Sequence, residues 1–186
     1  MKSMQQTDLS NYSNYPYNPG GNTLKRFLWY YINAIFFKTS LLPVNGIKAA
    51  LLRLFGAKIG KNLTIKPGVN IKYPWQLTVG DNTWIGENVW IDNLAPVTIG
   101  SNSCVSQGAL LLTGSHNYKK TTFDLITGAI ILEDGAWLGA KAVVNQGITV
   151  ASHAVLTTGS IATKNLEAYS IYQGNPAIKI RDRRLK

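Results

Sequence analysis

Residues 79–116 read VGDNTWIGENVWIDNLAPVTIGSNSCVSQGALLLTGSH, which divides into six consecutive segments that each begin with Ile, Val or Leu. Five of these segments are six residues long, and the third has eight. The same period covers residues 59–78 and returns over residues 132–167. An apolar residue repeated at so short a period is the sequence signature of a β-helix, in which each segment supplies one side of a coil.

Three sides make one coil, so the fifteen segments of this kind predict about five stacked coils. Their first positions then form three columns. The first column contains Ile59, Val79, Ile99, Leu132 and Val150. The second contains Ile65, Ile85, Val105, Leu138 and Leu156. The third contains Ile71, Ile91, Leu111, Val144 and Ala162. Side chains in one column lie about 4.8 Å apart, the spacing of neighbouring strands, and form one continuous core. The predicted fold is mainly β, a parallel β-helix over residues 59–168.

The composition agrees with a single folded domain. The chain has 186 residues, of which 45% are hydrophobic and 15% charged, far from the composition of a disordered chain. Its one cysteine, Cys104, excludes an intrachain disulfide framework and favours a cytoplasmic location. Cys104 ends a regular segment, so we interpret it as a packing residue rather than a nucleophile.

The net charge of +10 is concentrated at the two ends of the chain. Residues 1–58 carry seven Lys and Arg against one acidic residue, residues 59–170 carry seven of each sign, and residues 171–186 carry five against one. A protein that binds nucleic acid is expected to have a basic stripe on its folded body, so this pattern argues against that partner. Basic ends fit the phosphates of a nucleotide-like cofactor or an acidic membrane surface.

The N-terminal region divides into an extended arm at residues 1–22 and a helical segment at residues 23–56. Asn22 or Thr23 is expected to cap the first helix. One face of that helix is apolar and includes Leu24, Phe27, Leu28, Tyr31 and Ile35. The helix is too short to span a bilayer. Two interpretations stay open: the helices cover the end of the β-helix, or residues 24–55 rest on a membrane as a peripheral contact.

The segments resemble the left-handed parallel β-helix of the hexapeptide-repeat acyltransferases over residues 59–181, and the left-handed sense is implied by that resemblance. The stretches TLKRFLWYYINAIF at 23–36, LLRLFGAKIG at 51–60, TGSHNY at 113–118 and DGAWLGAKAVV at 134–144 resemble the colanic-acid-type polysaccharide O-acetyltransferases. The resemblance implies a homotrimer that transfers an acetyl group from acetyl-CoA to a hydroxyl of a saccharide, in exopolysaccharide biosynthesis. Two alternatives are a streptogramin-type antibiotic O-acetyltransferase and a non-enzymatic β-helix scaffold.

The period is interrupted once at length, by residues 117–131, directly after His116. We predict a protruding loop there, with His116 as the general base that removes the proton of the attacking hydroxyl. An imidazole titrates near pH 6.5 and suits this task, and the position matches the catalytic histidine of the family. The only other histidine, His153, lies in a regular segment and is interpreted as structural. Two histidines do not supply the three imidazoles of a carbonic-anhydrase-type zinc site, so no metal is expected.

The resemblance also assigns residues to the two substrates. Trp137, Ala140 and Thr158 match positions that line the pantetheine arm of acetyl-CoA, in a groove between neighbouring prisms. Thr163, Lys164 and Arg181 match positions near its nucleotide end. Residues 169–186 are expected to cross the coil end as a basic tail.

For the saccharide we predict contacts from Asp92 and Asn93, which begin an eight-residue segment one coil before His116. A carboxylate and an amide beside a base can orient a sugar hydroxyl. An equal alternative is a corner whose side chains serve their own backbone.

Overall fold

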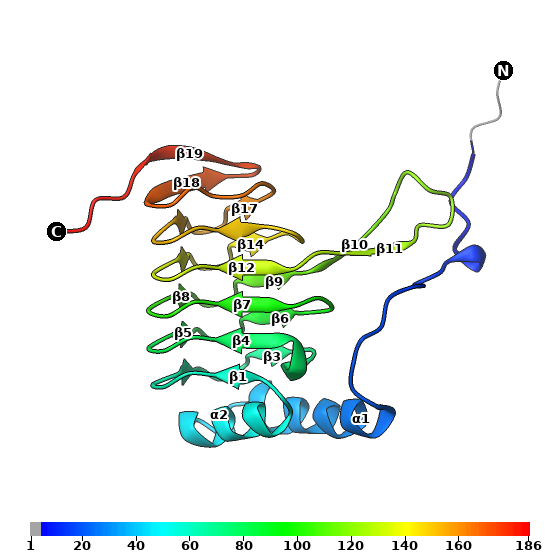
Figure 1. The fold of residues 1–186 in the computed structure, drawn as a ribbon, viewed down its shortest axis with the longest axis horizontal. Helices are drawn as coiled ribbons and strands as arrows, with labels where there is room; N and C mark the ends of the chain where they lie inside the picture. Colours follow the sequence, from blue (N-terminus) through cyan, green and yellow to red (C-terminus); the bar gives the residue numbers. More distant parts are fainter. Residues whose placement is uncertain (1–4) are drawn as a thin grey trace.

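The computed structural model describes residues 5–186, and in it the repeating segments wind into a β-solenoid of about six turns whose first end is covered by helices (Figure 1). Three sheets form its sides. The first sheet contains β1 (Lys58–Ile59), β4 (Leu77–Val79), β7 (Val97–Ile99), β12 (Ile130–Leu132) and β15 (Thr149–Val150). The second contains β2 (Thr64–Ile65), β5 (Trp84–Ile85), β8 (Cys104–Val105), β13 (Trp137–Leu138), β16 (Val155–Leu156), β18 (Ser170–Gly174) and β19 (Ala177–Asp182). The third contains β3 (Asn70–Ile71), β6 (Trp90–Asp92), β9 (Leu110–Leu112), β14 (Val143–Val144) and β17 (Ile161–Ala162).

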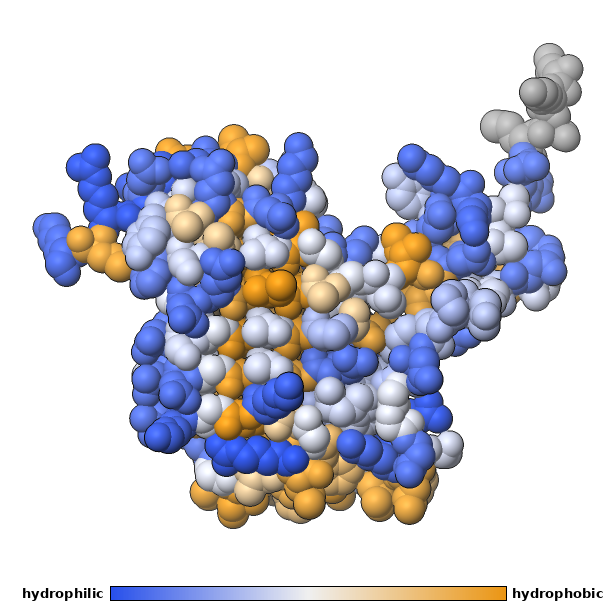
Figure 2. Space-filling view, viewed as in Figure 1, coloured by the Kyte–Doolittle hydropathy of each residue, from blue (hydrophilic) through white to orange (hydrophobic). Residues whose placement is uncertain are grey.

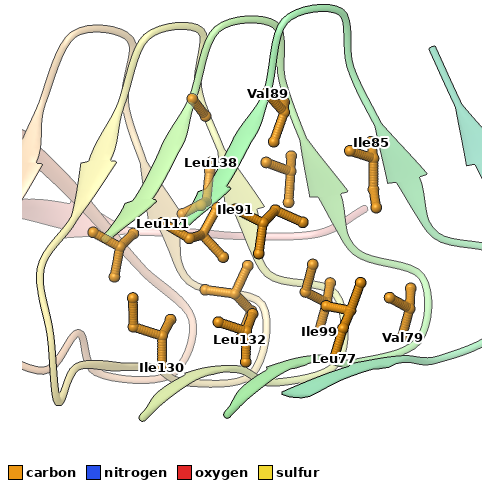
Figure 3. Packing of buried hydrophobic residues seen from close by; sticks show 14 of the residues in the cluster. Leu77, Val79, Ile85, Val89, Ile91, Ile99, Leu111, Ile130, Leu132 and Leu138 are labelled. Atoms are coloured by element: carbon orange, nitrogen blue, oxygen red, sulfur yellow. The ribbon is translucent and has the colours of Figure 1, made fainter. Parts of the chain in front are cut away.

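Strand register confirms the three predicted columns. In the second sheet, for example, Ile85 pairs in parallel with Ile65 on one side and with Val105 on the other. Every first-position residue except the half-buried Ile59 is buried. Figure 3 shows side chains from these columns pointing into the space that the sheets enclose. Because each column continues through successive coils, the core is a single rod of apolar side chains.

Corners of the solenoid bring neighbouring coils very close together. A Cβ atom added to Gly80 would lie 2.5 Å from the backbone nitrogen of Ser101 in the next coil, so a side chain does not fit there. Further along the same corner, Asn82 has φ 53° and Asn102 has φ 56°. Asparagine tolerates this left-handed conformation better than most residues. The Asn82 amide donates to Oδ1 of Asn102 at 3.3 Å, which links one corner to the next.

Two helices lie across the first end of the solenoid (Figure 1). Helix α1 (Thr23–Ile32) begins after the N-cap Asn22, whose side chain accepts a hydrogen bond from the Lys25 nitrogen. It continues as a π-helical segment, η2 (Asn33–Phe37), and α2 (Asn45–Leu54) follows. Two short 3-10 turns, η1 (Leu9–Asn11) and η3 (Pro74–Gln76), complete the helical elements of residues 5–186. No helix in residues 5–186 is long and apolar enough to cross a membrane.

The helices bury the face opposite to the predicted apolar stripe. Trp29, Phe37 and Leu52 are at most 2% exposed within the core cluster, and the Trp29 Nε1 donates to the carbonyl of Ile71 at 2.8 Å. The helices therefore cover the solenoid end, as one of the two interpretations expected. The stripe itself, at 45–64% exposure, faces outward; its residues are Leu24, Phe27, Leu28, Tyr31 and Ile35.

The one long interruption of the coils is an antiparallel hairpin of β10 (Gly114–His116) and β11 (Leu125–Thr127), which projects away from the solenoid (Figure 1). The solenoid resumes with Ile130, which pairs with Val97. Residues 130 and 131 therefore belong to a coil rather than to the loop. At the far end, Leu166 bridges to Val150 and β18 pairs with β16, which begins a sixth turn before β19 turns back.

Candidate functional site

The hairpin carries His116 away from the body of the solenoid and fixes the orientation of its ring. Nδ1 of His116 lies 3.0 Å from the carbonyl oxygen of Phe123 on the opposite limb. The two rings stack, with centroids 4.5 Å apart and an interplanar angle of 7°. A carbonyl oxygen can only accept a hydrogen bond, so Nδ1 of the neutral imidazole carries the proton. Nε2 is left with a lone pair, which is the state that a general base requires.

The tip of the hairpin is a hydrogen-bonded turn that aims this carbonyl. Phe123 has φ 52°, an uncommon left-handed value for a residue with a large side chain. Its nitrogen donates to the carbonyl of Lys120 at 3.1 Å. The Lys120 ammonium lies 3.0 Å from the Asp124 carboxylate. Hydrogen bonds from Thr122 and then Lys120 hold the pKa of Asp124 below its usual value. Contacts on both sides of Phe123 thus determine where its carbonyl points.

The described part of the N-terminal arm, residues 5–22, runs beside His116 and is held at two places. Its Asp8 nitrogen donates to the Thr121 carbonyl at 2.8 Å, and the Tyr12 ring lies 5.8 Å from the His116 ring. Near α1, the Pro19 carbonyl accepts a hydrogen bond of 2.7 Å from Nε1 of Trp75. The arm therefore spans from the hairpin to the first coil (Figure 1) and forms one wall of the region around His116.

Asp92 and Asn93 lie at the base of the hairpin and have different surroundings. Oδ1 of Asp92 lies 3.0 Å from the Lys72 ammonium. The Asn93 side chain is fully buried, accepts from the Tyr73 nitrogen at 2.9 Å and donates to the Tyr73 carbonyl at 2.6 Å. Neither side chain hydrogen-bonds to His116 within residues 5–186. The Asn93 side chain therefore hydrogen-bonds to the Tyr73 backbone, whereas the Asp92 carboxylate lies at the edge of a groove.

This groove, which we call the helix groove, lies between α1 and the third sheet and has a volume of about 390 Å³. Its walls include Arg26, Tyr30, Lys72, Tyr73, Trp90 and Asp92. Tyr17 of the arm lies next to it: burial first, and then the neighbouring Tyr73 and Asp92, raise the pKa of the Tyr17 hydroxyl well above its usual value. The helix groove therefore combines aromatic rings, cations and one carboxylate.

Four of the six residues assigned to acetyl-CoA share the second sheet and its adjoining corner. Trp137 is 45% exposed, and its Nε1 donates to Oγ of Ser106 at 3.0 Å. Successive register partners across β16, β18 and β19 connect Trp137 to Arg181. At the corner after β13, the Ala140 carbonyl accepts from the nitrogen of Gly159, the residue that follows the exposed Thr158.

Thr163 and Lys164 are both exposed and follow β17, at the corner between the third and first sheets. One side of the triangle, the third sheet, therefore separates them from Ala140 and Thr158. Within a single chain the six residues do not form one site.

Several residues near these sites were not identified from the sequence. A groove of about 480 Å³ at the far end is lined by Arg181, Arg183 and Arg184, together with Ile171 and Asp182. The excess of basic residues in the tail was the available signal for Arg183 and Arg184. Tyr12 and the Phe123 carbonyl gave no signal, because their contacts depend on how distant segments meet.

The remaining candidates have structural surroundings. His153 has φ 59° and stacks on Tyr169, with centroids 4.7 Å apart and an angle of 3°. Cys104 is half-buried between Trp84 and Trp137, its register partners in the second sheet. No group of three or more His, Cys, Asp or Glu side chains converges as a metal site in the described part of the chain.

Comparison with known proteins gives matches along most of the chain. A family model described as "Hexapeptide repeat of succinyl-transferase" matches residues 76–112 and 129–164. Over 176 residues the chain is 40% identical to the "Putative colanic acid biosynthesis acetyltransferase WcaF" of Escherichia coli (strain K12), which covers 95% of this chain and 97% of that protein. Over 138 residues it is 27% identical to the galactoside O-acetyltransferase of the same strain, covering 73% of this chain and 68% of that one.

A solved structure has the same fold. The hexapeptide-repeat containing acetyltransferase VCA0836 of Vibrio cholerae O1 biovar eltor, complexed with acetyl coenzyme A, superposes with a TM-score of 0.77 at 23% identity. The match covers 87% of this chain and 88% of that one.

Proposed function

This chain belongs to the hexapeptide-repeat acetyltransferase family, and from that premise we propose that it transfers the acetyl group of acetyl-CoA to a hydroxyl of a saccharide in exopolysaccharide biosynthesis. The relative with 40% identity is named for colanic acid biosynthesis, and the solved relative is complexed with acetyl coenzyme A. The observation that carries the proposal is the His116 ring, whose Nδ1 is engaged by the Phe123 carbonyl. Its Nε2 is therefore free to accept a proton.

In the proposed mechanism Nε2 of His116 removes the proton from the acceptor hydroxyl while that oxygen attacks the thioester carbonyl. The new C–O bond gives a tetrahedral intermediate. Its collapse breaks the C–S bond and expels the CoA thiolate, which takes the proton back from the His116 imidazolium. The products are the O-acetyl ester and free CoA. The Phe123 carbonyl stabilises the positive ring in between, because it accepts from the Nδ1–H throughout.

We propose that the donor site is completed by a second copy of the chain. One subunit would offer Trp137, Ala140 and Thr158 to the pantetheine arm, and residues at another corner of its neighbour, Thr163 and Lys164, would meet the nucleotide end. Arg181 would add a charge-assisted contact with a phosphate. A homotrimer with solenoids side by side supplies such grooves.

For the acceptor we propose the helix groove, with Asp92 as the hydrogen-bond partner of a sugar hydroxyl. Aromatic rings such as those of Tyr73 and Trp90 in its wall offer apolar surface with polar edges, which suits a sugar ring. Asn93 would act indirectly, by fixing the backbone of Tyr73.

We also propose a cytoplasmic location at the inner face of the membrane. The single cysteine fits a reducing compartment. Residues 23–58 combine apolar helices with six Lys or Arg and no acidic residue, as expected of a protein that meets anionic lipid.

The test measures acetyl transfer from acetyl-CoA to a panel of saccharides, with the release of the free thiol of CoA as the readout. The two histidines supply a matched pair of variants, His116→Asn and His153→Asn, because asparagine tolerates the left-handed conformation at position 153. Removal of a general base is expected to lower kcat by about 10²-fold or more, so His116→Asn should lose activity and His153→Asn should keep it. Full activity in His116→Asn would overturn the mechanism, and acetyl transfer to antibiotics but not to saccharides would overturn the proposed acceptor.

A further inference from the structure

The outer surface of the helical layer is apolar. Side chains from α1, η2 and α2 point away from the solenoid with exposures of 45–76%. We call this surface the end face and define it by Leu24, Phe27, Leu28, Ile35, Ile47 and Leu54. Figure 2 shows hydrophobic side chains along the bottom of the molecule, where the helices of Figure 1 lie. A surface helix of a globular protein ordinarily turns polar residues outward, so this face is an exception that points to a partner.

The solenoid core does not account for these residues, because the same helices already contribute other side chains to it. Trp29, Phe37, Leu52 and Phe55 are buried in the core. The helical layer therefore has two apolar faces, and only one of them is covered by the described chain. Solenoids packed side by side, as in the proposed trimer, would leave their ends uncovered and set three end faces in one plane.

The charges of the residues around the end face indicate what kind of partner it binds. Residues 23–58 contain six Lys or Arg and no acidic residue. Three of these cations, Lys38, Arg53 and Lys58, are exposed, Lys25 and Arg26 are half-buried on α1, and Lys48 is buried in the core. Basic residues around a flat apolar helical surface complement anionic phospholipid headgroups. Exposed Tyr30 and Tyr31 add amphipathic rings of the type found at membrane interfaces.

We propose that the end face docks on the surface of a membrane that contains anionic phospholipid, with α1 and α2 lying in the plane of the interface. The apolar side chains enter the boundary between headgroups and acyl chains, and the cations stay at headgroup level. This inference specifies which surface holds the protein at the membrane location given in the proposed function. It rests on the proposed function only for the compartment in which that membrane lies. The surface itself is defined by the exposed residues and their charges.

The experiment is co-sedimentation of the purified full-length chain with vesicles, either of phosphatidylcholine alone or of phosphatidylcholine with about one third phosphatidylglycerol. The end-face variant is Phe27→Ser with Leu54→Ser, whose side chains are 57% and 76% exposed and so can change without disturbing the core. The matched control is Ile180→Ser with Leu185→Ser at the opposite end of the molecule, where the side chains are 47% and 56% exposed.

We expect binding to the anionic vesicles that weakens with added salt, is at least tenfold weaker in the end-face variant and is unchanged in the control. Absence of vesicle binding, or equal binding by both variants, would overturn the inference. A change in oligomeric mass would also overturn the inference. If the wild-type protein had a mass above that of a trimer and this mass fell in the end-face variant, a second copy of the chain would be covering the end face. Acetyl transfer to a soluble acceptor is measured in parallel. If the protein transfers acetyl groups but does not bind vesicles, only the membrane-docking inference is refuted. If it binds vesicles but does not transfer acetyl groups, only the proposed function is refuted.

Discussion

Two histidines of the same chain differ in what their rings meet. The His116 ring stacks on Phe123 and has its Nδ1 engaged by a carbonyl, whereas the His153 ring stacks on Tyr169 at a corner of the solenoid. The sequence could separate the two, because the period stops at His116 and continues through His153. It could not identify the Phe123 carbonyl as a partner, because the direction of a backbone group in a turn depends on φ and ψ values that no residue pattern specifies here.

The buried lysine leads to a prediction about pH. Lys48 is fully buried, and its ammonium donates a hydrogen bond of 3.3 Å to the Lys66 carbonyl and lies over the face of the Phe37 ring. Burial lowers the pKa of Lys48 from its usual 10.5. Below the lowered pKa, the Lys48 amine of the folded protein is charged and desolvated. Above the usual pKa, the Lys48 amine is neutral in both the folded and the unfolded protein. Lys48→Met should therefore stabilise the fold at pH 7, by on the order of 1 kcal/mol, and the gain should shrink as pH rises toward 10.5.

Thermal unfolding at pH 7 and near pH 10.5 measures this difference. Lys58→Met is the control, since Lys58 is exposed and its replacement should not change the pH dependence. A loss of stability in Lys48→Met at pH 7, or a gain that does not vary with pH, would contradict the prediction.

At the scale of an element, the corner glycines have a definite role. Gly80 directly follows the first-position residue Val79, where the backbone comes close to a neighbouring segment. In the structure the neighbour is the next coil: a Cβ on Gly80 would lie 2.5 Å from the nitrogen and 2.6 Å from the hydroxyl of Ser101. Gly80→Ala should therefore lower the free energy of unfolding by roughly 1–3 kcal/mol, the usual effect of overpacking.

Gly46 in α2 is the matched comparison, because nothing lies within 4 Å of a Cβ built there. Gly46→Ala should raise stability by about 0.5–1 kcal/mol, because alanine restricts the unfolded chain and favours a helix. Urea denaturation of both variants gives the two changes. Equal effects at the two positions would show that coil spacing does not depend on these glycines.

The helices illustrate the limit of reading an element from its pattern. The apolar stripe of α1 was recognised from its spacing, but Phe27 and Tyr31 face outward while Trp29 faces the core. Both faces of this helix are apolar, and periodicity locates a face without identifying what lies against it. The strands were easier, because each inward residue has the same neighbours one coil away.

For the whole molecule, the repeat predicted five coils and their register, because every coil meets only the coils beside it. The sixth turn was missed, since residues 166–172 no longer follow the period. The path of the arm past His116 was missed too, because a contact between Tyr12 and the hairpin joins segments about a hundred residues apart and has no periodic signal.

Assembly gives a third prediction. Trp84 is 58% exposed on the second sheet, in line with Cys104 and Trp137. A side-by-side trimer would cover this indole, so Trp84→Lys should lower the mass measured by light scattering and weaken CoA binding at least tenfold. Leu41→Lys is the control, because Leu41 is 78% exposed next to the helices at the end of the rod rather than on its side. A wild-type chain that stays monomeric with CoA bound would contradict the shared groove.

Because the coils rise by a uniform spacing, the number of coils below the hairpin sets its height above the end face. The hairpin leaves the third coil, and two coil spacings amount to about 10 Å, to which the helical layer adds roughly the 10 Å thickness of a helix. With the end face on a bilayer, His116 would work about 20 Å above the lipid, and sugars closer to their anchor would escape modification. An extra coil inserted below the hairpin would move the modified position outward by about 5 Å, so the number of coils would determine which unit of a growing glycan is decorated.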